Sequence, residues 1–80
     1  MREIQVIITE FPSMPNRFYY TLIIDKQQKS KGRDAGTGGA EAAAAKAVEL
    51  AKSYYGQYTI FAPKKVLDCI PERLRSGVSK

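Results

Sequence analysis

The sequence predicts a small α+β domain in which one alanine-rich helix packs on one face of a small antiparallel sheet. Two early segments alternate apolar and polar residues, as half-buried strands do. An alanine-rich segment follows, and a further strand and a short helical segment end the chain. The expected order is therefore strand, strand, strand, helix, strand and a short C-terminal helical segment. Eighty residues allow one domain, residues 1–80.

The first two strands are expected over residues 3–10 and 17–25, separated by a loop with two prolines. In each strand one face is mainly apolar, and these residues predict the core: Ile4, Val6 and Ile8, then Phe18, Tyr20, Leu22 and Ile24. The opposite faces carry Gln5, Ile7 and Thr9, then Tyr19, Thr21 and Ile23.

A polar third strand is expected over residues 29–35, after a turn over residues 25–28. Its side chains are nearly all polar, which is typical of a solvated edge strand. Lysine side chains on such a strand discourage pairing with other chains.

The helix is expected from about Gly39 to Tyr55, because alanine is the best helix former. Its small side chains let the helix lie close to a sheet; the expected stripe is Ala40, Ala44, Ala47, Val48 and Ala51. Gly36, Gly38 and Gly39 before the helix are predicted to permit unusual backbone angles, with Thr37 as the cap. Gly56 is expected just after the helix end.

Residues 58–62 predict another strand, and residues 63–75 predict a short helix followed by a turn. Pro63 suits the first helical position and Pro71 interrupts the helical spacing of the apolar residues. The alternative is a hairpin between residues 58–62 and 65–70. The tail, residues 76–80, is expected to fray.

The chain has few residues of the types that enzymes use for catalysis. There is no histidine, so the commonest general base and metal ligand is missing. The glycine-rich loop lacks the Gly-Lys-Ser/Thr ending of a phosphate-binding loop. The single cysteine, Cys69, lies in an apolar run and is expected to be buried and structural. The sequence therefore predicts a protein that is not an enzyme, with no cofactor, no metal and no small-molecule ligand.

A binding protein is favoured instead. Thirteen basic and eight acidic residues give a net charge of +5, and no apolar run is long enough to span a membrane. Exposed arginine and tyrosine side chains dominate many protein-binding surfaces. The candidate partner-binding residues are Arg17, Tyr19, Lys26, Lys29, Lys31, Arg33, Lys64, Lys65 and Arg73. A second hypothesis is a small basic nucleic-acid-binding module that uses the hairpin around residues 25–28.

The second half of the chain carries a family resemblance. The segments are "GAEAAAAKAVELA", "YTIF" and "KKVLDCIPERLR", in that order and spacing. They resemble the fifth-numbered family of phage-encoded anti-CRISPR proteins directed against the type I-F system. The matching residues are Ala42 to Ala47, Lys65-Val66-Leu67, Ile70-Pro71-Glu72 and Leu74-Arg75, and the Gly32-Arg33 pair fits the early part. The chain departs from the family at Cys69, where an aromatic residue is expected, and in the lysines of the third strand.

The resemblance implies a stoichiometric inhibitor in the cytoplasm of a bacterial host. Such proteins bind the crRNA-guided surveillance complex of type I-F, the Csy complex. The implied target is the large Cas subunit near its helical bundle, and the implied effect is to block recruitment of the helicase–nuclease. A net charge of +5 makes this chain a poor DNA mimic, so inhibition would have to work by covering a protein surface.

Overall fold

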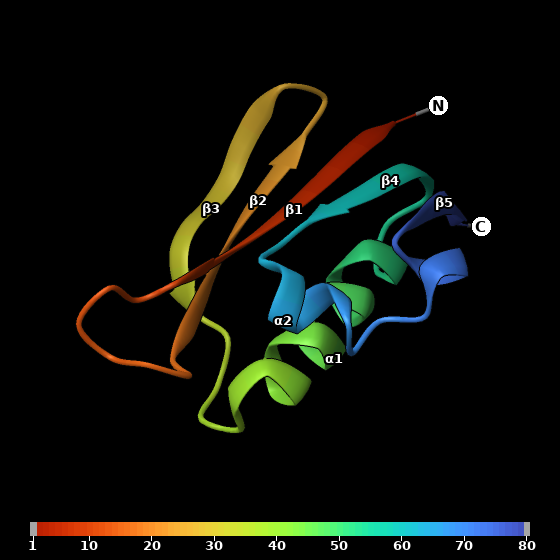
Figure 1. Cartoon of the computed structure of the whole chain (residues 1–80). Coiled ribbons are helices and arrows are strands. Elements are labelled where there is room, and N and C mark those ends of the chain that lie inside the picture. Colours follow the sequence, from red (N-terminus) through yellow and green to blue (C-terminus); the bar gives the residue numbers. More distant parts are fainter. Residues whose placement is uncertain (1, 80) are drawn as a thin grey trace.

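The computed structural model describes residues 2–79 and contains a five-stranded sheet with helices on one face (Figure 1). The strands are β1 (Glu3–Glu10), β2 (Phe18–Ile24), β3 (Gln27–Asp34), β4 (Gly56–Phe61) and β5 (Ser76–Ser79). The helices are α1 (Gly39–Lys52), α2 (Lys64–Leu67) and the 3₁₀ helix η1 (Glu72–Leu74). The predicted α+β class and its order of elements are confirmed.

The sheet has the strand order β3-β2-β1-β4-β5 and is mostly antiparallel. The exception is the central pair, in which β1 and β4 run parallel with Val6 beside Ile60. Since β3 is antiparallel to β2, and β2 to β1, strands β3 and β4 point the same way. Two such strands need a long crossover connection, and helix α1 provides it.

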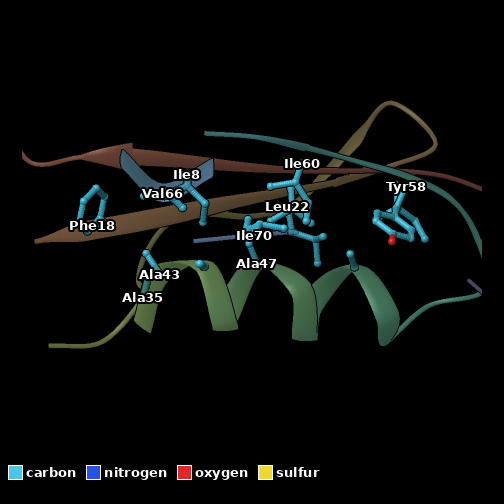
Figure 2. Packing of buried hydrophobic residues seen from close by; sticks show 14 of the residues in the cluster. Ile8, Phe18, Leu22, Ala35, Ala43, Ala47, Tyr58, Ile60, Val66 and Ile70 are labelled. Carbon is cyan, nitrogen blue, oxygen red and sulfur yellow. The ribbon is translucent and has the colours of Figure 1, made fainter. Parts of the chain in front are cut away.

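The core lies between α1 and the sheet face that the alternation predicts. The β1 residues Ile4, Val6 and Ile8 are buried there, and so are the apolar β2 residues Phe18, Leu22 and Ile24. Helix α1 contributes only alanines to the fully buried set: Ala43, Ala44, Ala47 and Ala51. Figure 2 shows these side chains between the strands and the helix, with Val66 and Ile70 of the closing segment beside them.

Helix α1 begins at Gly39, as predicted, but its N-cap is not the predicted residue. Gly38 holds the N-cap position and no side chain caps the helix, so the prediction for Thr37 is wrong. Gly36 and Gly39 have φ angles of +105° and +73°, which are costly for other residues. The prediction of unusual backbone angles is therefore confirmed for Gly36 and Gly39 and wrong for Gly38, whose φ of −85° is open to any residue.

The C-terminal end of α1 comes earlier than predicted, at Lys52 instead of Tyr55. The hydroxyl of Ser53 donates to the Glu49 carbonyl at 2.7 Å and helps to end the helix. Gly56 is not a helix-ending residue but the first residue of β4. It packs so closely on β1 that a Cβ atom would lie 2.3 Å from the Arg2 carbonyl oxygen.

The β2–β3 turn is tighter than predicted. Asp25 and Lys26 form a two-residue turn with φ angles of +52° and +67°, as the twist of a hairpin favours. Strand β3 therefore starts at Gln27, two residues before the predicted start. Its side chains are almost all exposed, which confirms the expected polar edge.

The closing segment forms a short helix followed by a turn, as predicted, and the alternative hairpin does not form. Pro63 precedes α2 as its N-cap instead of occupying the first helical position. The expectation of a frayed tail is wrong through Ser79, because β5 pairs with β4 and satisfies its outer edge. Gly77 lies beside the Tyr58 ring, and a Cβ atom there would make an ordinary contact with the phenol oxygen, at 3.5 Å.

Enlarging a buried alanine of α1 should destabilise the fold. Ala47 is fully buried against the sheet, so Ala47→Leu should lower the free energy of unfolding by about 1–3 kcal/mol. The matched control is Ala45→Leu, on the exposed side of the same helix, which should change it by less than about 0.5 kcal/mol. Urea denaturation measures both. Equal effects would contradict a close helix–sheet contact.

Candidate functional site

One face of the sheet is covered by helices α1 and α2, whereas within residues 2–79 no helix covers the other face (Figure 1). We call this second surface the open face. It consists of the side chains that alternate with the core residues: Gln5, Ile7, Thr9, Tyr19, Thr21, Ile23, Gln57, Thr59, Phe61 and Val78. These side chains are half-buried or exposed, so they present an accessible surface.

Apolar side chains lie near the middle of the open face. Ile7 sits between Thr21 of β2 and Phe61 of β4, and Ile23 of β2 lies opposite Gln5. The Phe61 side chain is 49% exposed, which is unusual for a large apolar residue on a central strand.

Aromatic packing extends the open face toward the β1–β2 loop. The rings of Phe11 and Tyr19 meet edge to face, with centroids 4.9 Å apart. The loop itself is closed by backbone hydrogen bonds, of which the Phe11 N–H to the Arg17 carbonyl is the shortest at 2.8 Å. Tyr19 is therefore held in place before any partner arrives.

Charges lie at the rim of the open face and not in its centre. Glu3 begins β1, and Asp34 ends β3 beside Tyr19. A hollow of about 450 Å³ lies over Gln5, Gln57, Thr59 and Val78, and Glu3 also lines it. An apolar centre with a charged rim is the composition of protein-binding surfaces.

Two carboxylates are held in place at the loop end of the sheet, Asp34 beside Tyr19 of the open face and Glu10 opposite Phe18 on the helix side. The Asp34 carboxylate accepts the Gly36 N–H at 2.8 Å and pairs with Arg17. Glu10 accepts the Asn16 N–H at 3.1 Å and pairs with Lys65 Nζ at 3.0 Å. These hydrogen bonds, with the neighbouring cations second, lower the pKa of both carboxyls below their ordinary values.

The structure does not bring the nine predicted binding residues together. Arg17 and Tyr19 lie at the loop end of the open face, and Lys26, Lys29, Lys31 and Arg33 follow the β3 edge. Lys64 and Lys65 belong to α2, and Arg73 belongs to η1 beside the opposite edge strand β5. Arg17 and Lys65 are engaged in ion pairs within the chain.

The sequence-based list missed Ile7, Ile23 and Phe61. The signal was available for two of them, since Ile7 and Ile23 stand on the second face of strands whose first face is already apolar. A strand that is apolar on both faces predicts a covered sheet or a surface for a partner. Phe61 ends its strand, where alternation is harder to follow.

The β3 edge is poorly suited to pairing with a further strand. Two register shifts interrupt its ladder with β2, around Leu22, and an irregular edge opposes strand addition. A partner is therefore not expected to add a strand at β3.

Cys69 is exposed, so the prediction of a buried cysteine is wrong. The turn after α2 points Ile70 into the core and leaves Cys69 outside. It borders a hollow of about 730 Å³ between α1 and the α2 turn, with Glu41, Glu49 and Asp68. Within residues 2–79 no three His, Cys, Asp or Glu side chains are grouped to hold a metal ion.

No protein-family model matches the chain, and no curated protein matches it. In the part of the chain that the structure describes, none of the helices is both long and apolar enough to cross a membrane.

Acid should weaken the fold through the carboxyls of Glu10 and Asp34. Their pKa values are lower in the folded chain than in the unfolded one, so their stabilisation is complete above the ordinary carboxyl pKa of about 4. It is lost as the pH falls through the folded pKa values. The free energy of unfolding, measured in urea at pH 6 and pH 3, should therefore fall less in Glu10→Gln/Asp34→Asn than in the original chain. An equal fall in both proteins would contradict this assignment.

Proposed function

We propose that this chain is a phage- or prophage-encoded inhibitor of type I-F CRISPR interference. It acts in the cytoplasm of the bacterial host and binds the crRNA-guided surveillance complex. The open face covers part of the large Cas subunit, and the bound inhibitor prevents recruitment of the helicase–nuclease. The inhibitor works by stoichiometric binding, without turnover and without a cofactor.

The choice of partner is supported by the sequence resemblance, whose residues have clear structural tasks. Ile70 is buried and Pro71 precedes η1. Arg75 donates through Nη2 to the Leu67 carbonyl at 2.8 Å and through Nε to the Ile70 carbonyl at 3.1 Å. The resembling ending therefore shapes the scaffold that closes the core, and the resemblance is one of fold-determining residues.

The choice of surface is supported by one observation above all, the apolar centre of the open face. Ile7, Ile23 and Phe61 lie accessible among uncharged polar groups, inside a charged rim. Docking there would remove apolar area from water without stripping water from unpaired charges. Such a surface favours binding to a protein over binding to a charged ligand.

Purified chain should bind a type I-F surveillance complex in a pull-down. The assay uses complexes with and without target DNA, followed by helicase–nuclease recruitment and DNA cleavage. Inhibition should be complete at about one chain per complex, because each copy blocks one surface. Binding in neither state would contradict the proposal, and complete inhibition by trace amounts would contradict stoichiometric action.

A charge in the centre of the open face should weaken this binding. Phe61→Asp should raise the dissociation constant at least tenfold, since burying a new carboxylate costs more than about 1.4 kcal/mol. The control is Met14→Asp, which changes an apolar side chain of similar exposure, 53%, in the β1–β2 loop. Isothermal titration calorimetry with the surveillance complex measures both. Equal loss in the two variants would remove the open face as the docking surface.

A further inference from the structure

A second surface, on the helix side of the sheet, collects cations between β3 and α1. Arg33 lies opposite Tyr20 in the β2–β3 register, so both side chains point to the helix side. From α1, the Lys46 ammonium lies 5.9 Å from the centre of the same Tyr20 ring. Two cations therefore flank one half-buried tyrosine.

The line of cations continues toward the start of β1. A hollow of about 450 Å³ there is lined by Arg2, Lys29 and Tyr54, together with Ile24, Asp25 and Gln27. Tyr20 and Ile24 are four residues apart on β2, so the cations extend over about 13 Å of strand. We call Arg2, Lys29, Arg33 and Lys46 the basic strip.

The basic strip lacks carboxylate partners. Within residues 2–79 the ion pairs are Arg17 with Asp34 and Lys65 with Glu10, and neither involves the strip. Lys29 Nζ contacts only a neutral amide oxygen, that of Gln27, at 3.3 Å. The Asp25 carboxylate lines the same hollow and accepts the Glu3 N–H at 3.0 Å through Oδ1, so it offsets part of the charge of Arg2 and Lys29. Four cations beside one carboxylate leave an excess of positive charge, which an anionic ligand would neutralise.

The composition of the strip favours phosphate groups over an acidic protein surface. A protein partner gains affinity from an apolar centre, and three of the four exposed large hydrophobic side chains, Met14, Phe61 and Val78, belong to segments that do not contribute to the strip. The fourth, Tyr55, is the aromatic neighbour of Tyr54 in the chain. Around the strip the neighbours are hydrogen-bonding side chains such as Gln27 and Ser30. The half-buried Tyr54 ring lies among the cations of the hollow, an arrangement suited to a nucleotide base.

We propose that the basic strip binds the phosphate backbone of single-stranded nucleic acid, with the Tyr54 ring against a base. Arg2, Lys29, Arg33 and Lys46 contact successive phosphates. The strip and the open face lie on opposite sides of the sheet, so one chain can hold a protein and a nucleic acid at once. The inference stands apart from the proposed inhibition, since it needs only free oligonucleotide for its test.

The test is fluorescence anisotropy of a labelled 20-nucleotide single strand of mixed sequence, titrated with the full chain at several salt concentrations. With three or four phosphate contacts, the logarithm of the association constant should fall with the logarithm of salt at a slope of about −2 to −3. Arg33→Glu/Lys46→Glu should weaken binding in 50 mM salt at least tenfold. Arg33→Gln/Lys46→Gln, a milder change, should reduce the slope by about 1.4.

The matched control is Lys52→Glu/Lys64→Glu, which makes the same change in net charge away from the strip. It should retain much tighter binding than Arg33→Glu/Lys46→Glu, while circular dichroism confirms that each variant is folded. No binding in 50 mM salt, or equal loss in both charge-reversed variants, would overturn the proposal. Binding of polyglutamate but not of the oligonucleotide would also overturn it and assign the strip to an acidic protein.

Discussion

The close contact between the alanine face of α1 and the sheet determines the rest of this structure. Only alanines of α1 are fully buried, while the strands supply the large side chains of the core. Small residues on the helix let it approach, so Leu22 and Ile60 fill the space between the two layers (Figure 2). A helix with larger side chains would have to lie farther from the sheet and would leave less of the sheet covered.

One helical layer on one face has a necessary consequence for the other face. In the described residues, α1 and α2 lie on the same side, and the remaining face is formed by the five strands, with β3 and β5 at its edges (Figure 1). The central strands still carry Ile7, Ile23 and Phe61 there. Accessible apolar side chains lower the solubility of a protein, and a contiguous group of them on a surface marks a binding site for a partner.

The sequence contains enough information for the class, the strand faces and the helix, because these follow from periodicity and alanine content. It fails where one local feature depends on a distant one. Gly56 reads as a helix end, yet its backbone is constrained by Arg2, the residue that precedes the neighbouring strand β1. The tail has no pattern of its own and forms β5 only because β4 offers an unpaired edge. The candidate site was harder to predict than the fold. The cations of β3 and η1 were grouped by residue type, but the fold places these two elements at opposite edges of the sheet.

The separation of apolar and charged surfaces gives this small domain two distinct chemistries. Cations that lie opposite core residues of β2, such as Arg33 beside Tyr20, are directed to the helix side. The open face keeps uncharged side chains at its centre, and its rim carboxylate Asp34 is already satisfied by the Gly36 N–H and Arg17. Successive side chains of a strand point to opposite faces of the sheet, so these cations and the apolar side chains of the open face lie on different surfaces. A net charge of +5 cannot by itself reveal which surface a partner meets.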